Sequence, residues 1–373
     1  MESPSRPTRM EINLTAIQHN IRTIQSRVGP AVEVMAVVKA NGYGHGAVSV
    51  ARAAIDAGAT WLGVATLEEG LQLRQAGLSH PILVFGSIGR QYLETAISQS
   101  LDMVVYDLDV LQSVSAAAER VRQPGQIHLK IDTGMGRVGL LPEWFGQDWV
   151  NHVQNPNLRW RGLMSHLADS DGPDETNTRE QLRTFLDIIE KARQWGALPR
   201  WIHLANSAAA MRYPGTWFNL VRIGIAMYGG LPYEKAQGLQ PALTWRSNIT
   251  HIKRVPRGFY VGYGKTYCTE QDAWIVNVPV GYADGYRRTL SNLAQVLIRG
   301  HRYPVVGRIS MDQLSVAIPI TDDVAIGDDV VLIGQDGDEK IRVEELANTI
   351  DTISYEIFTG ISDRVPRLYG YSD

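Results

Sequence analysis

Short apolar runs alternate with helical patterns along the first 225 or so residues of the chain. Amphipathic or alanine-rich segments lie between the runs, and several of them end in glycine, as helices commonly do. The eight apolar runs are residues 32–38, 61–65, 81–86, 102–106, 127–132, 160–166, 201–205 and 219–224. The helical segments include residues 46–58, 67–77, 90–100, 108–122 and 176–195.

Strands that alternate with helices predict βαβ units and a parallel sheet. Eight such units within about 200 residues is the number found in a (β/α)8 barrel, or TIM barrel. An open doubly wound sheet is the alternative, but it usually has fewer strands and a G-x-G-x-x-G turn after the first strand, which is absent here. We therefore expect a (β/α)8 barrel over residues 1–235.

The pattern changes after about Tyr228, where short alternating runs separated by turn signals replace the helices. A loop-like segment, residues 231–238, comes first, and one helical segment, residues 343–349, comes late. The alternating runs are residues 243–255, 274–280, 295–298, 302–308, 314–319 and 329–333. They predict a second, mainly β domain over residues 236–373.

Composition and charge narrow the classes of function. The chain has 373 residues, 44% of them hydrophobic, and a formal charge of −3, which is ordinary for a soluble enzyme and argues against a nucleic-acid partner. No stretch approaches the length of apolar residues that a membrane span needs, and the N-terminus carries no secretory signal. The single cysteine, Cys268, excludes a disulfide framework and a cysteine-cluster metal site. It fits a reducing compartment, so we expect a cytoplasmic protein.

The first predicted strand ends at Lys39, at the end of the barrel where active sites lie. One interpretation is a lysine that packs its stem on the rim and keeps its ammonium in water. The other is a partly desolvated lysine with a lowered pKa, able to form a Schiff base. Three glycines follow within residues 40–46, and glycines at alternate positions let the backbone pass close to a ligand, which favours the second interpretation.

Other strand ends supply cations and helix-capping groups. Arg137 follows a glycine-rich turn after the fifth strand, which suits either a carboxylate clamp or a surface salt bridge. Asn206 and Ser207 follow the seventh strand, where either is a natural N-cap and where barrels usually bind phosphate. Arg222 and Gly224 end the eighth strand, and the amide of Gly224 can serve the same phosphate.

A lysine and a phosphate pocket in one barrel indicate pyridoxal 5'-phosphate, whose aldehyde bonds a lysine and whose phosphate needs a helix end. A class I aldolase with a phosphorylated substrate fits the same groups. His166 ends the sixth strand, where a lone histidine is more often structural than functional. We expect no metal, because no histidine pair with ligand spacing accompanies clustered carboxylates.

Seven motifs in one order resemble those of bacterial alanine racemases. In the predicted barrel they are KANGYGHG at residues 39–46, KIDTGMGRVG at 130–139 and ANSA at 205–208. In the second domain they are VGYG at 261–264, GYADGY at 281–286, VGRISMDQ at 306–313 and TISYE at 352–356. The resemblance runs from about Thr8 to Leu368, nearly the whole chain.

This resemblance implies an isomerase, a pyridoxal-phosphate-dependent racemase that interconverts L-alanine and D-alanine and supplies D-alanine for peptidoglycan synthesis. It implies that Lys39 carries the cofactor and acts as one catalytic base. Tyr263, from the second domain of a partner subunit, is implied as the other base, in a homodimer with shared active sites. Arg137 and Met311 match substrate-contacting positions.

The resemblance also implies a cofactor-binding set. Arg222 matches an arginine at the pyridine nitrogen, with His166 and His203 bonded to it. Lys130 matches a lysine that is carbamylated in some members and orients Arg137. The full set that matches cofactor-binding positions is Lys39, Tyr43, His166, Asn206, Ser207, Arg222, Gly224, Ile225 and Tyr355.

Racemisation needs a proton removed from one face of the α-carbon and returned to the other, so two acid–base groups are expected. An arginine facing the pyridine nitrogen leaves it unprotonated, which we expect to suppress transamination. Tyrosine is a poor base at neutral pH, and we expect the cations Arg222 and His166 to lower the pKa of Tyr263.

Four positions depart from the family pattern, at Gly42, Leu167, Ile223 and Ser310, where alanine, phenylalanine, proline and cysteine are usual. None removes a titratable or cofactor-binding group, so we expect effects only on pocket shape and substrate range.

Two other functions fit less well. A pyridoxal-phosphate decarboxylase on the same barrel would carry a catalytic cysteine late in its second domain and a glycine triplet, and the chain has neither. A cofactor carrier made of the barrel alone would have no use for a second domain.

Overall fold

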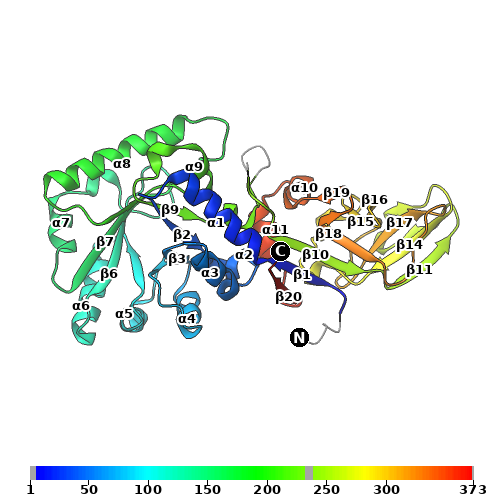
Figure 1. Ribbon diagram of the computed structural model, residues 1–373, viewed down its shortest axis with the longest axis horizontal. Helices are drawn as coiled ribbons and strands as arrows, with labels where there is room; N and C mark the ends of the chain where they lie inside the picture. The colour runs from blue at the N-terminus through cyan, green and yellow to red at the C-terminus, as the bar shows by residue number, and fades with distance from the viewer. Residues whose placement is uncertain (1–5, 232–237, 372–373) are drawn as a thin grey trace.

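The computed structural model describes residues 6–231 and 238–371 of the chain. Figure 1 shows two lobes, one with helices around a central sheet and one made mostly of strands. The predicted fold class, a (β/α)8 barrel followed by a mainly β domain, is confirmed. The predicted boundary between residues 235 and 236 lies outside the described residues.

The barrel strands follow the eight predicted apolar runs. They are β2 (Glu33–Val37), β3 (Trp61–Val64), β4 (Ile82–Val84), β5 (Asp102–Val105), β6 (Gly125–Lys130), β7 (Leu158–Met164), β8 (Trp201–His203) and β9 (Leu220–Ile223). All pair in parallel in the order β8-β7-β6-β5-β4-β3-β2-β9. The two end strands meet where the amide of Arg222 donates to the carbonyl of Ala205 over 3.0 Å. Every residue of β3 and β5 is buried, because helices cover the outer face and side chains fill the interior.

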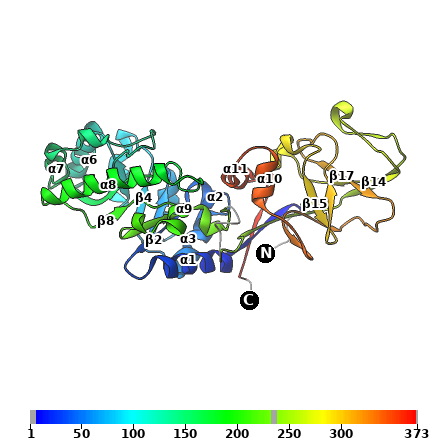
Figure 2. The same cartoon turned by 90° about the horizontal axis from the view of Figure 1, so that it is seen from above.

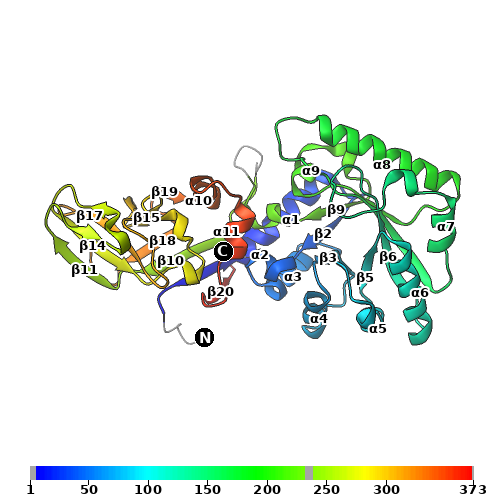
Figure 3. The same ribbon diagram turned by 180° about the vertical axis from the view of Figure 1, so that it is seen from behind.

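Helices surround the barrel, with α8 along one side and α4, α5 and α6 along the other (Figures 1 and 3). They are α1 (Leu14–Val28), α2 (Lys39–Tyr43), α3 (Ala47–Asp56), α4 (Leu67–Gln75), α5 (Leu93–Ser98), α6 (Leu108–Val121), α7 (Gln147–Val153), α8 (Thr176–Gln194) and α9 (Ser207–Arg212). Capping residues fix where several of these helices begin. Thr66 and Glu69 form a capping box at the N-terminus of α4, and Asp107 caps the N-terminus of α6. No helix in the described ranges is long and apolar enough to cross a membrane.

The second domain contains two larger sheets and one short one. The strands are β10 (Leu243–Asn248), β11 (His251–Val255), β12 (Tyr260–Val261), β13 (Tyr267–Cys268), β14 (Ala273–Val278), β15 (Gln295–Ile298), β16 (His301–Pro304), β17 (Leu314–Pro319), β18 (Asp329–Asp336), β19 (Glu339–Ile341) and β20 (Arg367–Gly370). The run predicted over residues 243–255 is therefore two strands. The predicted late helix is α10 (Val343–Thr349), and a second helix, α11 (Ser354–Gly360), was not predicted. Figure 2 shows both helices between the lobes.

The strand β1 (Arg9–Asn13) lies in the sheet of the second domain although it precedes the barrel in sequence. It pairs antiparallel with β10 and parallel with β20, in a sheet ordered β16-β15-β18-β10-β1-β20. Its alternating burial places Met10 and Ile12 in the core, at 0% and 1% exposure. The predicted assignment of residues 1–235 to the barrel thus included one strand that belongs to the other sheet.

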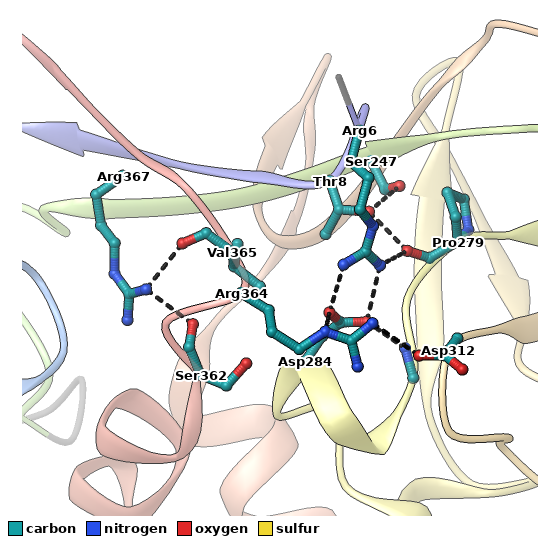
Figure 4. A network of polar contacts seen from close by, with 11 residues as sticks. Arg6, Thr8, Ser247, Pro279, Asp284, Asp312, Ser362, Arg364, Val365 and Arg367 are labelled. Atoms are coloured by element: carbon teal, nitrogen blue, oxygen red, sulfur yellow. Dashed lines mark hydrogen bonds and ion pairs between the residues drawn. The ribbon is translucent and has the colours of Figure 1, made fainter. Parts of the chain in front are cut away.

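A network of arginines and carboxylates fixes the chain next to β1 (Figure 4). Arg6 donates to both oxygens of Asp284, over 2.7 and 3.0 Å, and to the carbonyl of Pro279 over 2.6 Å. Asp284 is fully buried and lies 3.7 Å from the Nε of Arg364, which bonds Asp312 over 2.7 Å. Arg6, the first described residue, is thereby bonded to the segment that follows β14. Through Asp284 and Arg364 it is also linked to Asp312, the residue after Met311.

Candidate active site

A cavity of about 440 Å³ opens at the C-terminal ends of the barrel strands. It brings together most of the residues that the sequence singled out. Among its lining residues are Lys39, Tyr43, Lys130, Arg137, His166, Asn206, Ser207, Arg222, Gly224, Ile225 and Tyr355. Tyr355 comes from α11, so the second domain contributes to the wall of the cavity.

Lys39 begins a short left-handed turn, labelled α2, directly after β2. Ala40 and Asn41 have φ of 51° and 53°, a conformation that costs free energy in residues with a side chain. The turn is held from outside: the amide of Ala40 donates to Glu69 over 2.6 Å, and Asn41 accepts from the amide of Ala47 over 3.0 Å. This over-determined turn fixes the position of Lys39 at the rim.

The glycines after Lys39 make room for other parts of the chain. A Cβ on Gly44 would collide with the carbonyl of Phe358, and one on Gly46 with the hydroxyl of Tyr369. Neither glycine lines the cavity. The expectation that these glycines admit a ligand is therefore wrong for Gly44 and Gly46, which admit α11 and β20 of the second domain.

Four cationic side chains face this cavity, and they suit it to anions. Burial lowers the pKa of Lys130 to about 8, and the cation of Arg137 adds to the effect. Burial and Arg137 likewise lower the pKa of Lys39, which increases the fraction of its amine that is neutral and nucleophilic. The four cations are Lys39, Lys130, Arg137 and Arg222. The described residues that line the cavity include a single carboxylate, Asp171.

The loop that carries Arg137 is built around Asp132. The carboxylate of Asp132 accepts the amides of Gly134, Gly136 and Arg137 over 3.0, 3.1 and 3.1 Å. The guanidinium of Arg137 forms no ion pair with the residues that the structure describes. The alternative prediction, that Arg137 forms a surface salt bridge, is therefore wrong. The geometry favours the carboxylate clamp.

A cradle of hydroxyls and amides lies where a barrel usually binds phosphate. Asn206 caps α9 by accepting the amide of Ala209 over 3.1 Å. Ser207 accepts the amides of Gly224 and Ala226 over 2.9 and 3.3 Å. A Cβ on Gly224 would collide with the hydroxyl of Tyr43, so glycine is required for this close approach.

Two tyrosine rings complete the cradle. The rings of Tyr43 and Tyr355 lie 5.9 Å apart. Burial raises the pKa of Tyr43 and raises the pKa of Tyr355 to about 12. Both phenols therefore keep their protons at neutral pH and are able to donate hydrogen bonds to an anion.

Arg222 is buried at the base of the cavity, 4% exposed, with backbone carbonyls and histidines around it. Its terminal nitrogens donate to Nδ1 of His203 over 3.0 Å and to Nδ1 of His166 over 3.2 Å. They also reach the carbonyls of Ser165, His203 and Leu204. Burial lowers the pKa of Arg222 to about 9, so the side chain remains a cation at neutral pH.

His166 does not add a second positive charge. Burial and the charge of Arg222 lower its pKa well below the usual range, so the imidazole is neutral at neutral pH. The expectation that His166 and Arg222 are both cations is therefore wrong for His166. The positive charge at this end of the cavity belongs to Arg222.

Tyr263 and Met311 do not line the cavity of their own chain. Both lie in the second domain and are 70% and 52% exposed. Tyr282 and Ile353 are also exposed, at 42% and 61%. Exposed apolar side chains of this size are typical of a contact surface. One chain alone therefore does not bring Lys39 and Tyr263 together.

Some lining residues were not expected from the sequence. Ser170 and Asp171 come from the irregular segment before α8, which has no periodic signal, and Ser170 donates to Asn206 over 2.7 Å. Among the four departures from the family pattern, Leu167 lines the cavity and Gly42, Ile223 and Ser310 do not. An effect on pocket shape is therefore expected from Leu167.

Two family descriptions together match most of the chain. Residues 12–232 match the N-terminal domain of alanine racemase, and residues 242–369 match the C-terminal domain of alanine racemase. An alanine racemase from Symbiobacterium thermophilum is 45% identical over 98% of this chain and 97% of its own length. One from Desulforamulus reducens is 43% identical over 97% of this chain and 99% of its own length.

Solved structures agree with the sequence relatives. The alanine racemase from D-cycloserine-producing Streptomyces lavendulae superposes with a TM-score of 0.94, at 39% identity over 100% of this chain and 98% of that one. The alanine racemase from Bacillus anthracis with bound L-Ala-P superposes with a TM-score of 0.93, at 37% identity over 99% and 96%. The fold, the order of the motifs and these relatives agree, and the chain belongs to the alanine racemase family.

Proposed function

We propose that the protein is an alanine racemase, an isomerase that interconverts L-alanine and D-alanine with pyridoxal 5'-phosphate as cofactor. The observation that carries the proposal is the presence of Lys39 and the Ser207–Gly224 cradle in one cavity above Arg222. In this proposal the protein acts in the cytoplasm and supplies D-alanine for peptidoglycan synthesis.

The residues of the cavity fit pyridoxal phosphate. Lys39, with its lowered pKa, suits the aldehyde. Gly224, Ser207 and the protonated phenols of Tyr43 and Tyr355 suit the phosphate. When bound, the cofactor supplies an electron sink for the charge that forms on the α-carbon.

The remaining side chains have separate tasks. Arg137 binds the substrate carboxylate, and Lys130 holds the field around it positive. The Nζ of Lys39 takes or returns the proton on one face of the α-carbon. Arg222 would face the pyridine nitrogen of the cofactor. Because an arginine gives up no proton, it would limit the electron sink and favour return of the proton over side reactions.

The second face requires a group that one chain does not provide. We assign this role to Tyr263 of the partner subunit, in a homodimer whose exposed Tyr263 and Met311 reach the cavity of the other chain. The barrel then binds the cofactor, and the second domain completes the site of its partner. Two-fold symmetry gives two such sites in each dimer.

A chiral assay tests the proposal. L-Alanine is incubated with the protein and pyridoxal phosphate, and the two enantiomers are separated at intervals. We expect an equal mixture at the end, and no conversion by Lys39→Ala. The proposal fails if L-alanine is unchanged although the protein binds the cofactor. It also fails in its choice of lysine if Lys39→Ala retains a coloured adduct that borohydride reduces.

A further inference from the structure

A line of buried polar side chains crosses the interior of the barrel and ends at Arg222. Oδ1 of Asp102 lies 3.4 Å from Nε2 of His128. Nδ1 of His128 lies 2.8 Å from Nε2 of His203, and Nδ1 of His203 lies 3.0 Å from Nη1 of Arg222. Asp102, His128 and His203 are all 0% exposed, so water does not interrupt the line.

The far end of the line is closed by a second arginine. Asp102 is the first residue of β5, at the end of the barrel opposite the cavity. Its Oδ2 accepts from Nη1 of Arg161 over 2.9 Å. The guanidinium of Arg161 stacks over the rings of Trp61 and Trp201, 4.7 and 4.6 Å from their centres. The carboxylate of Asp102 is thus paired with the cation of Arg161, which holds it in one orientation next to His128.

The barrel interior is shaped around these imidazoles. A Cβ on Gly162 of β7 would collide with Nδ1 of His128, so the ring occupies space that glycine provides. The β6–β7 register shifts between Ile127 and His128. The ring also packs edge-on against Trp61, at 5.3 Å between centres.

The direction of each hydrogen bond follows from Asp102. Oδ1 of Asp102 and Nε2 of His128 form no hydrogen bond with the described residues, and the two atoms face each other at 3.4 Å. Because a carboxylate only accepts, this contact favours the tautomer of His128 with its hydrogen on Nε2. Burial lowers the pKa of both histidines, so each is neutral and has one donor and one acceptor. Nδ1 of His128 therefore accepts from Nε2 of His203, and Nδ1 of His203 is left as an acceptor for Arg222.

The remaining bonds of Arg222 leave one hydrogen free for the cavity. Nη1 and Nη2 are taken up by His203, His166 and backbone carbonyls. The Nε–H bonds none of the described residues, and Arg222 lines the cavity.

We propose that Asp102 and His128 are positioning residues for Arg222. They hold His203 in the tautomer that accepts from Nη1, which turns the Nε–H of Arg222 toward the pyridine nitrogen. The part of this proposal that concerns the pyridine nitrogen rests on the proposed function, and the part that concerns the tautomers does not. A purely structural ion pair between Arg161 and Asp102 would leave Arg222 unaffected, and this is the alternative to be excluded.

The wild-type protein provides the first test and needs no variant. The ¹⁵N shifts of labelled histidine separate the two neutral tautomers from each other and from the imidazolium. In cofactor-free protein we expect His128 and His203 to carry hydrogen on Nε2. Hydrogen on Nδ1 of His203, or an imidazolium at either position, would overturn the proposal.

The second test compares Asp102→Asn with Leu83→Ala. The amide turns a donor toward either Arg161 or His128, so we expect the ¹⁵N pattern of His203 to change. Leu83→Ala removes packing from a buried apolar cluster of the barrel, changes none of the side chains named above that contact the line or Arg161, and serves as the control for lost stability. Asp102→Asn with an unchanged His203 pattern would show that the carboxylate does not set the tautomer.

The third test uses the cofactor-loaded protein. For Asp102→Asn we expect kcat to fall about 10-fold, the lower end of what loss of an outer-shell partner costs. KM for alanine should stay at its wild-type value, and the absorbance of the bound cofactor should titrate at a different pH. Leu83→Ala should match the wild type in kcat, in KM and in the titration of the absorbance. A changed tautomer with unchanged kcat and titration would overturn the positioning role. A wild type that fails to racemise alanine would refute the proposed function and leave the tautomer result standing.

Discussion

Gly224 donates its backbone amide to the hydroxyl of Ser207 over 2.9 Å, across the ends of two neighbouring barrel strands. The same hydroxyl accepts the amide of Ala226 over 3.3 Å, so one serine holds the turn after β9 against the start of α9. The phosphate cradle depends on this single oxygen.

Ser207→Ala should weaken binding of pyridoxal phosphate. Two buried amides lose their acceptor, at a cost of about 1–3 kcal/mol, or about 5- to 150-fold in the dissociation constant. Fluorescence titration of cofactor-free protein measures the constant. Ser247→Ala removes a buried serine that bonds Thr8 in the second domain, and it should bind the cofactor as the wild type does. Equal affinity in all three proteins would contradict the assignment of the cradle.

Two inactive variants should restore activity when mixed. Lys39→Ala lacks one base and Tyr263→Phe lacks the other, and a mixed dimer has one site with both bases and one with neither. Random exchange of equal amounts should return about a quarter of wild-type activity, because half of the dimers are mixed and half of their sites are complete. Native mass spectrometry verifies the exchange. Mixed dimers without activity would place both bases on one chain.

Arg222→Glu should alter the selectivity of the reaction. An acidic partner favours a protonated pyridine nitrogen, which strengthens the electron sink. We expect slower racemisation and more pyruvate from transamination, measured on the same sample after cofactor binding is verified. Arg193→Glu, an exposed change on α8, should behave as the wild type. An unchanged ratio of pyruvate to D-alanine would remove Arg222 from this role.

His45 should make the fold sensitive to acid. It is 0% exposed, and Nδ1 lies 2.9 Å from the carbonyl of Tyr43. Burial lowers its pKa from 6.5 to about 4, so the unfolded chain takes up the proton first and stability falls as pH falls from 6.5 to 4. Between pH 7 and pH 4, the wild type should lose about 3 kcal/mol more unfolding free energy than His45→Asn, which keeps the donor to Tyr43.

Urea unfolding at a series of pH values measures this difference. His251→Asn changes an exposed histidine and should lose stability in parallel with the wild type. Parallel curves for His45→Asn and the wild type would mean that the imidazole of His45 does not govern the acid loss.

The barrel was predictable because its strands are buried on both faces and appear as apolar runs. The strand β1 was not, since Arg9–Asn13 is short and its partners begin at Leu243 and Arg367. Strands that pair across more than 200 residues leave no pattern in the neighbouring sequence that would predict the pairing. The same applies to α11, whose place is set by contact with α2 near Gly44.

The strand ends of the site were predictable because barrel geometry fixes where functional groups gather. Asp102 and His128 were missed because neither lies at the C-terminal end of its strand: Asp102 begins β5, and His128 lies within β6. A signal was present: His128 and Lys130 are two residues apart and lie on one face of β6, where they alternate with the apolar Ile127 and Leu129. Why Tyr263 and Met311 matter is not visible in one chain, because the group they serve belongs to another copy in the proposed dimer.

The position of β1 between β10 and β20 sets an order of events during protein synthesis. β1 leaves the ribosome about 230 residues before β10, and the eight barrel strands all emerge between them. The barrel is thus able to fold before the partners of β1 have been made. Until then both edges of β1 are unpaired, and strands in this state are prone to wrong pairing. Both edges of β1 can be paired only after β20 has been made. Tyr355 of the cavity wall and the strand β20 are both made late, so in the proposed dimer the cavity and the surface with Tyr263 and Met311 are complete only in a finished chain.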